Sequence, residues 1–227
     1  MMLGAGAVAG GLLPGVARAG EMLTLPMPAE PGFESPLGPA TMSPLGPPLP
    51  PSPVGTPEYT RRILATAKSQ SDRVAASLWR RDVVGIADFS RPSWEPRLHF
   101  ANLENGTVRS FLLAHGRGSD PGHSGWLQNF SSSVGSEATS RGAYLTCEWY
   151  NGKYGTSVRL KGLDRDNYTA LERAIVMHPA WYVDSSLVEK FGKIGRSEGC
   201  FAMSKTDFQE ALWHLSGGRL LFADRIA

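Results

Sequence analysis

The sequence predicts a mostly β domain, either a sandwich or a barrel-like sheet, with a few peripheral helices. Three observations predict this fold class. Short apolar or alternating segments recur between residues 82 and 222, and they have the length of strands. Asn105-Gly106 and Asn151-Gly152 separate neighbouring segments, as two-residue hairpin turns do. Only two stretches of the chain have helical character.

The first element is a helix that we expect to run from residue 58 to about Trp79. Thr56, Pro57 and Glu58 combine an N-cap hydroxyl, a proline at the first helical position and an acid in the first turn. Apolar residues then recur at near-helical spacing: Ile63, Ala67, Val74 and Leu78. This pattern predicts an amphipathic helix that packs on the rest of the domain.

Strands follow the helix, each marked by alternation or by a run of β-branched and aromatic residues. The expected strands are 82–88, 97–102, 107–115, 142–150, 156–160, 174–177 and 219–222. Residues 206–215 have helical character and predict a second helix near the C-terminus.

An apolar segment, residues 2–16, opens the chain and is too short to span a membrane. Ala17-Arg18-Ala19 follows it and fits cleavage by a signal peptidase. No Lys or Arg precedes the run, and a start codon placed further upstream would supply the missing charge. We therefore expect residues 1–19 to be an export signal, truncated at its charged start. A disordered tail on a cytosolic protein is the alternative.

Residues 20–57 are expected to be a proline-rich linker. Twelve of the 17 prolines lie between Pro26 and Pro57, and that stretch has only two charges, Glu30 and Glu34. Proline lacks a backbone donor and favours extended polyproline conformations, so the segment suits a spacer. A PxxP ligand for a partner domain is the alternative. Residues 58–227 remain as one folded domain that includes the N-terminal helix.

Charge and composition exclude several classes of protein. The 23 Lys and Arg residues against 21 Asp and Glu give a net charge of +2, which argues against a nucleic-acid binder that depends on counterion release. No apolar run reaches 18 residues, so no membrane span is expected in the mature chain. Two cysteines and five scattered histidines form no ligand motif, so we expect neither a metal nor another cofactor.

The segment 174–203 carries the residues best suited to catalysis. His178 follows an apolar run, and Cys200 follows Ser197, Glu198 and Gly199. A thiol attacks as the thiolate, which a nearby imidazole generates. Gly199 leaves room for backbone N–H groups to face a reacting carbonyl. Spacing alone also allows both cysteines, Cys147 and Cys200, to be inert core residues or a disulfide pair.

The run R-S-E-G-C-F-A-M at 196–203 resembles the S-x-G-C signature of YkuD-type L,D-transpeptidases. Within them it is most similar to the murein L,D-transpeptidase catalytic domain subgroup. The resemblance extends over about 84–222 through a series of ordered motifs: 86–93, 114–119, 144–146, 150–155, 159–163 and 173–178. It implies the β-rich L,D-transpeptidase catalytic fold.

The resemblance also implies roles for individual residues. Cys200 matches the nucleophile and His178 the general base, whose imidazole the carbonyl of Pro179 would orient. Backbone N–H groups around Gly199 and Cys200 would form the oxyanion site, with Ser197 supporting it. Three further residues are candidates for substrate contact by their own chemistry: Arg196, His115 and Tyr182. The alternatives are that Arg196 offsets the charge of Glu198, that His115 is structural and that Tyr182 packs in the core or at the rim.

The implied substrate is the tetrapeptide stem of peptidoglycan, in the periplasm or cell envelope. The thiol would attack the carbonyl of the L-centred third residue and expel the terminal D-Ala, leaving a thioester. An amine of another stem would then give a 3→3 cross-link, whereas water would give L,D-carboxypeptidase activity. No cofactor is required by this chemistry.

Three positions depart from the commoner family pattern. Pro179, Glu198 and Ala202 stand where many members have Gly, His, and Arg or Asn. These departures keep three alternatives open: hydrolysis of the same stems, release of an envelope protein from a stem, and a degenerate envelope protein that binds peptidoglycan without chemistry. Glu198 beside a thiolate would disfavour it, so we expect its side chain to point away from the sulfur.

Overall fold

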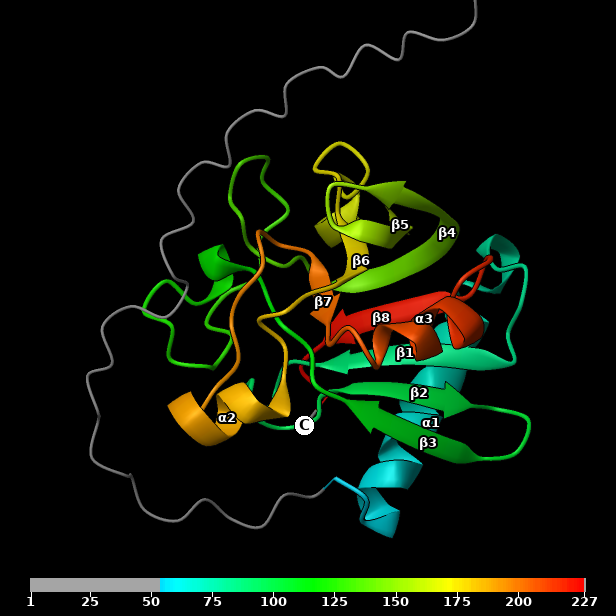
Figure 1. Ribbon diagram of the computed structural model, residues 1–227. Helices are drawn as coiled ribbons and strands as arrows, with labels where there is room; N and C mark the ends of the chain where they lie inside the picture. Colours follow the sequence, from blue (N-terminus) through cyan, green and yellow to red (C-terminus); the bar gives the residue numbers. More distant parts are fainter. Residues whose placement is uncertain (1–53, 227) are drawn as a thin grey trace, which may run out of the picture. The chain divides into compact units, whose positions relative to one another are not determined.

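The computed structural model describes residues 54–226. The predicted export signal and most of the predicted linker therefore lie outside the described residues. Three α-helices and eight strands make up the described chain, and the predicted mostly β class is confirmed. Figure 1 shows the strands curling around one another with the helices at the periphery.

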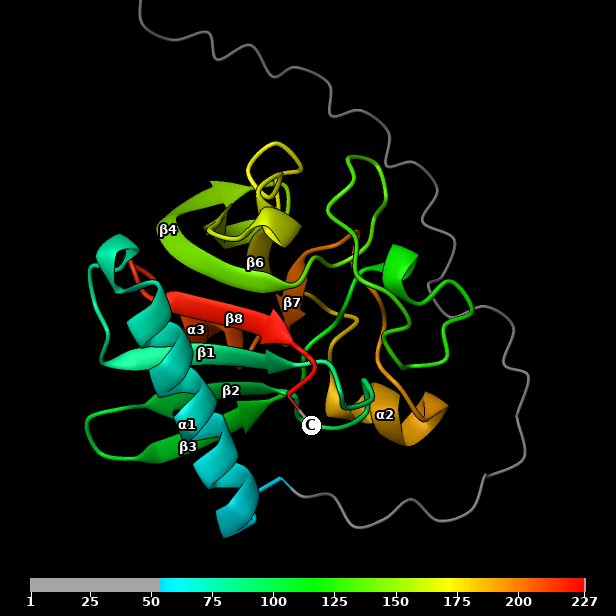
Figure 2. The ribbon, with the colours of Figure 1, turned by 180° about the vertical axis from the view of Figure 1, so that it is seen from behind.

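Helix α1 (Pro57–Arg73) begins as predicted: the Oγ1 of Thr56 accepts the N–H of Tyr59, and Pro57 occupies the first turn. One face is buried at a spacing of four residues, through Tyr59, Ile63 and Ala67. Figure 2 shows α1 lying across the back of β1, β2, β3 and β8. The helix ends at Arg73 rather than near Trp79, and a short 3₁₀ turn takes the chain on from Ala75.

The eight strands form one mixed sheet: β1 (Val83–Asp88), β2 (Leu98–Asn102), β3 (Thr107–Phe111), β4 (Gly142–Gly152), β5 (Gly155–Gly162), β6 (Val176–Pro179), β7 (Phe201–Met203) and β8 (Leu220–Asp224). Their order is β3-β2-β1-β8-β4-β5-β6-β7. Two neighbouring pairs are parallel, β1 with β8 and β6 with β7, and the other pairs are antiparallel.

The two ends of this sheet meet. After β3, the N–H of Ala114 donates to the carbonyl of Ala202 in β7 at 2.9 Å, in an isolated antiparallel bridge. Because β3 and β7 are the first and last strands of the order, the bridge nearly closes the sheet into a barrel. The barrel-like alternative is therefore the observed architecture.

Apolar side chains are buried on both faces of the sheet. One cluster joins the strands to α3 (Phe208–His214) and includes Leu160, Met177 and Phe201. A second joins Val84, Ile86 and Leu220 to α1. Burial on both faces accounts for the nearly uniform apolar character of β1 and β8.

Two elements were not predicted. Strand β7 has three residues, too few to show a period, and it lies directly after Cys200. Helix α2 (Ser185–Phe191) is a two-turn helix that begins at the N-cap Asp184 and ends at Gly192, whose φ is +70°. The seven predicted strands correspond to β1–β6 and β8, and the second predicted helix to α3.

Candidate active site

The site is built where β6 and β7 run side by side. In this parallel pair His178 is opposite Ala202, and Cys200 precedes Ala202 by two residues. Cys200 lies in the bend immediately before β7, one residue outside the paired strand. Tyr154 stacks on His178 and also interacts electrostatically with Cys200, so both side chains lie near the Tyr154 ring.

The imidazole of His178 is held by its own backbone neighbour. Its Nδ1 lies 3.0 Å from the carbonyl oxygen of Pro179, which can only accept, so Nδ1 carries the proton and Nε2 the lone pair. Burial lowers the pKa of His178, and the bond to Pro179 opposes this only in part. The imidazole is therefore neutral near pH 7 and free to accept a proton at Nε2.

The thiol of Cys200 is 6% exposed, and burial raises its pKa to about 11. The N–H of Val176 and the guanidinium of Arg173 favour the thiolate, whereas Glu198 disfavours it. The sulfur lies 3.9 Å from the carbonyl oxygen of Ala174. The backbone of Ala174 has a φ of +51°, which is uncommon for a residue with a Cβ. At rest the thiol is protonated, so the proton must leave as the sulfur reacts.

Ser197 and Gly199 fix the backbone around the thiol. The Oγ of Ser197 donates to the carbonyl of Cys200 at 2.6 Å and accepts the N–H of Gly199 at 3.3 Å. Gly199 has φ of +106°, which L side chains rarely adopt. A Cβ there would also lie 2.9 Å from the carbonyl oxygen of Ala138. Glycine is thus required by both conformation and space.

A second glycine, Gly116, packs directly against Gly199. A Cβ at Gly116 would lie 2.7 Å from the Cα of Gly199 and 2.2 Å from the carbonyl oxygen of Glu137. The flanking backbone is tied to Ser197 on both sides: His115 accepts the N–H of Ser197 at 2.9 Å, and Arg117 donates to its carbonyl at 2.7 Å. This segment buttresses the turn that carries the nucleophile.

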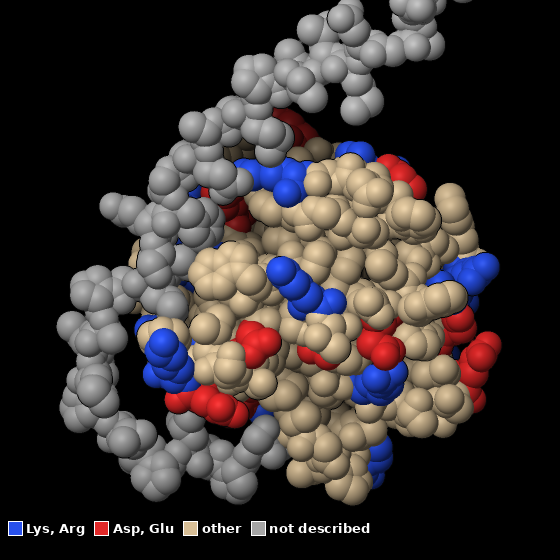
Figure 3. Space-filling view, in the orientation of Figure 1, with Lys and Arg blue, Asp and Glu red and all other residues tan. Residues whose placement is uncertain are grey.

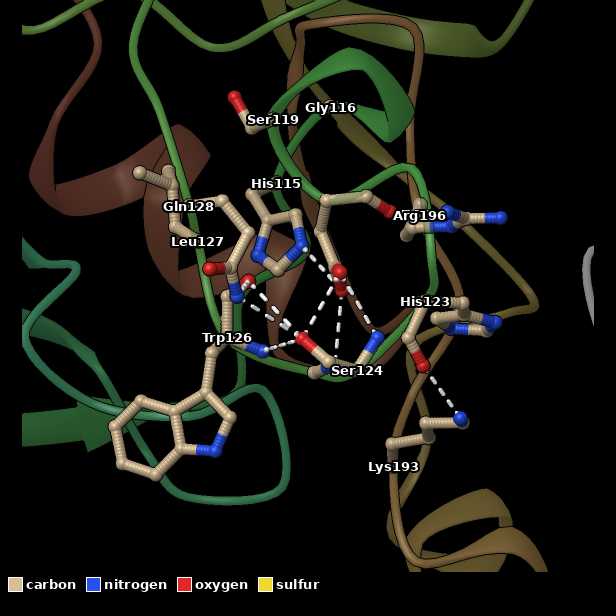
Figure 4. A network of polar contacts seen from close by, with 12 residues as sticks. His115, Gly116, Ser119, His123, Ser124, Trp126, Leu127, Gln128, Lys193 and Arg196 are labelled. Carbon is tan, nitrogen blue, oxygen red and sulfur yellow. Dashed lines mark hydrogen bonds and ion pairs between the residues drawn. The ribbon is translucent and has the colours of Figure 1, made fainter.

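His115 lies in the core behind this turn. Its Nδ1 is 2.7 Å from the fully buried guanidinium of Arg97, so Nδ1 accepts and Nε2 carries the proton toward Asp120, 3.4 Å away. Burial and Arg97 lower the pKa of His115 to about 4, which keeps the ring neutral. Figure 4 shows the His115 ring within the polar network that also includes Ser124 and Arg196. Its side chain therefore supports the loop and contributes its backbone carbonyl to Ser197.

Asp120 is the acidic end of this network. Burial raises its pKa, but hydrogen bonds from His115 and from the N–H groups of Ser124 and Gly125 outweigh burial and hold the pKa well below its usual range. The guanidinium of Arg196 donates to the backbone carbonyl of the same residue. Arg196 thus links the nucleophile segment to the loop that contains Asp120. It does not pair with the carboxylate of Glu198, which is bound by a different arginine.

That arginine is Arg117, whose guanidinium lies 3.6 Å from Glu198 and also pairs with Glu137. Tyr182 is half-buried close to the thiol: its pKa is raised, first by burial and then by the charges of Cys200, Tyr154 and Glu198. Of the three expected substrate contacts, Tyr182 is thus the one placed beside Cys200.

Several residues of the site were not singled out from the sequence. Arg173 is held beside the thiol by the carbonyls of Ser131 and Ala138. Tyr154, from the turn between β4 and β5, stacks on His178. Both belong to motifs that carried the family resemblance, but no spacing rule links either to Cys200, because they reach the site from separate loops.

Cys147 is partly exposed and its thiol points to the carbonyl of Leu145, 3.6 Å away. It lines a cavity of about 510 Å³ together with the indoles of Trp79 and Trp149. Both cysteines are free, so Cys147 and Cys200 form no disulfide.

Among residues 54–226, no group of three or more potential metal ligands occurs. None of the helices in the same range has the length and apolar character needed to cross a membrane. Figure 3 shows Lys and Arg interspersed with Asp and Glu on the face drawn, with wide uncharged areas between them.

The fold and the site define a barrel-like β domain with a buried histidine on β6 and a buried cysteine immediately before the neighbouring parallel strand β7. The chain belongs to the L,D-transpeptidase catalytic domain family, whose sequence profile matches residues 56–223. The predicted family resemblance is therefore confirmed. A comparison with curated proteins finds no match.

Solved structures of L,D-transpeptidases are similar at low identity. An L,D-transpeptidase from Mycobacterium smegmatis is 15% identical over 63% of this chain and 58% of its own, with a TM-score of 0.39. One from Mycobacterium tuberculosis H37Rv is 14% identical over 63% of this chain and 57% of its own, with a TM-score of 0.40. The helical cell shape determining protein Pgp2 (K307A mutant) from Campylobacter jejuni is 14% identical over 74% of this chain and 56% of its own, with a TM-score of 0.40. The chain spans less than two thirds of each.

Proposed function

We propose that this protein catalyses cysteine-dependent acyl transfer on peptidoglycan tetrapeptide stems, through a thioester on Cys200. The observation that supports the proposal best is the pairing of β6 with β7, because His178 lies in β6 and Cys200 immediately precedes β7. The family to which the chain belongs supports the choice of substrate.

In the first step the Nε2 of His178 accepts the proton of the Cys200 thiol as the sulfur bonds to the carbonyl carbon of the third stem residue. The carbonyl of Pro179 accepts the N–H at Nδ1, so Nε2 is the nitrogen that has a lone pair to accept the thiol proton. The tetrahedral intermediate collapses when the bond to the terminal D-Ala breaks, and His178 returns the proton to the departing amine. A thioester remains.

The developing oxyanion needs donors beside the sulfur. The N–H of Cys200 serves this role best, because the N–H of Gly199 is already directed at Ser197. Ser197 fixes the Cys200 carbonyl, and the packing of Gly116 on Gly199 prevents the turn from relaxing. These contacts preorganise the site before substrate arrives.

The second step transfers the acyl group to an amine of another stem, which gives a 3→3 cross-link. Water as the acceptor gives L,D-carboxypeptidase activity with the same residues. Release of an envelope protein from a stem uses the same thioester chemistry. Pro179, Glu198 and Ala202, which depart from the commoner family pattern, are the positions at which the choice of acceptor would be set.

This substrate requires the protein to be exported to the periplasm or cell envelope. The export signal predicted at residues 1–19 supports that location, and the proline-rich segment after it supports a reach away from the membrane. Protease accessibility in intact spheroplasts tests it. A fully protected protein would remove the substrate from reach and contradict the proposal.

The chemistry is tested by intact mass of the full chain after incubation with a carbapenem, beside Cys200→Ala and Cys147→Ala. We expect one adduct on the wild type and on Cys147→Ala, and none on Cys200→Ala. Stem tetrapeptide is then supplied with and without an acceptor amine, and the products separate cross-linking from hydrolysis. Turnover of stems by Cys200→Ala would refute the proposed nucleophile. Stem binding without any turnover by the reduced wild-type chain would favour the degenerate binding protein.

A further inference from the structure

The imidazole of His178 is covered by an aromatic ring from a distant part of the chain. Tyr154 lies in the turn between β4 and β5, and its ring stacks on that of His178 with centroids 4.3 Å apart and planes 20° from parallel. The Nζ of Lys153 lies 5.4 Å from the centroid of the same tyrosine ring. Such close parallel packing restricts rotation of the imidazole about its χ2 angle.

Tyr154 also interacts with the turn that carries the nucleophile. Burial and, after it, the charges of Glu198 and Cys200 raise the pKa of Tyr154 to about 12. Glu198 is in turn paired with Arg117 at 3.6 Å. Tyr154 therefore contacts the base through its ring and interacts electrostatically with the nucleophile turn.

The site must hold a charge during reaction that it does not hold at rest. Burial keeps the thiol of Cys200 protonated and the imidazole of His178 neutral. When the sulfur attacks, the proton moves to Nε2 and a buried imidazolium forms. The face of an aromatic ring attracts a cation, and it does so more strongly away from water. The carboxylate of Glu198 adds negative potential near the same ring.

We infer that Tyr154 is a positioning residue for acyl transfer: it fixes the plane of the His178 imidazole and stabilises the imidazolium. The inference rests on the proposed function for its role in turnover. The stacking itself acts on His178 whether or not a stem is bound.

The experiment compares three variants in the full chain. Tyr154→Leu removes the aromatic face, and Tyr154→Phe keeps the face but loses the hydroxyl. Tyr150→Leu is the matched control, because Tyr150 is in the same hairpin but its ring packs against Arg159 at 4.8 Å.

The first readout is the imidazole itself, followed by NMR of histidine-labelled protein. We expect Tyr154→Leu to lower the pKa of His178 by about one unit relative to the wild type, while Tyr154→Phe and Tyr150→Leu stay within a few tenths. An unchanged His178 titration in Tyr154→Leu would overturn the inference. This readout does not require turnover.

The second readout is the rate of acylation by a carbapenem and the kcat and KM for stem tetrapeptide. We expect Tyr154→Leu to lower the acylation rate and kcat about tenfold with little change in KM, and Tyr154→Phe to restore most of the loss. Equal losses in Tyr154→Leu and Tyr150→Leu, or in Tyr154→Leu and Tyr154→Phe, would overturn it. If the wild type forms no adduct while the titration shifts as expected, the proposed function fails and the contact with His178 stands.

Discussion

The contact between Gly116 and Gly199 allows the effect of one substitution on stability and acylation to be estimated from distances in the structure. In Gly116→Ala the new Cβ would lie 2.2 Å from the carbonyl oxygen of Glu137 and 2.8 Å from the nitrogen of Gly199. The φ of Gly116 is −68°, so alanine suits the backbone and the cost is purely steric. Overpacking of this kind costs about 1–3 kcal/mol, which outweighs the roughly 0.4–1 kcal/mol gained from a less flexible unfolded chain.

The backbone of Gly199 must shift to admit the new methyl group, and it carries the nucleophile turn. We expect Tm to fall by about 3–10 °C and carbapenem acylation to slow by about 10- to 100-fold. Gly122→Ala is the control, because a Cβ at Gly122 would meet no atom within 4 Å. Thermal melts and time-resolved intact mass give the two quantities. If Gly116→Ala melts and acylates like Gly122→Ala, the buttress argument is wrong.

Three further predictions concern titration and the nucleophile turn. Alkylation of Cys200 by iodoacetamide, followed by peptide mapping, should keep rising with pH toward about 11, because burial raises the pKa of the thiol; a plateau near pH 7 would indicate a preformed ion pair. Burial lowers the pKa of His99 and His115 to about 4, so the unfolded chain takes up these protons first as pH falls. The free energy of unfolding in urea should therefore drop between pH 6.5 and 4, by about 1–3 kcal/mol for each histidine, and a flat profile would contradict this. Ser197→Ala leaves the Cys200 carbonyl without its donor, so it should lower the free energy of unfolding by about 1–3 kcal/mol and slow acylation by a carbapenem. Ser133→Ala, at an exposed serine, should leave the stability and the acylation rate unchanged.

Local signals were sufficient where a segment's own residues decide its conformation. The N-cap at Thr56 and the following proline and acid place the start of α1, and Asn105-Gly106 lies in the turn after β2. The turn predicted at Asn151-Gly152 was wrong by two residues, because that pair ends β4 and the turn falls on Lys153 and Tyr154. The helix end was wrong by several residues, because the chain leaves the helix after Arg73, although Val74 and Leu78 still pack against the same cluster. The spacing of apolar residues shows which side chains are buried, but it does not show that they all belong to one α-helix. A 3₁₀ turn can keep the next apolar side chains on the same buried face after the α-helix has ended.

Elements of two or three residues and loop contacts gave no signal of their own. Strand β7 exists because β6 and Ala114 pair with it from either side, and both partners come from remote parts of the chain. His115 was expected near substrate, yet its ring is committed to Arg97 and Asp120. Its surroundings depend on which loops pack together, and the residue type alone does not decide that.

The sequence by itself determined the mostly β class, the family and the candidate pair of Cys200 and His178, since these depend on local pattern and on motif order. Only the tertiary structure decided that the sheet nearly closes, that the parallel pairing of β6 with β7 brings the segments of His178 and Cys200 together, and that Tyr154, Arg173 and Gly116 lie around them. The physical reason is that these contacts join segments tens of residues apart. Their energies come from burial and register across the barrel, which no short stretch of sequence contains.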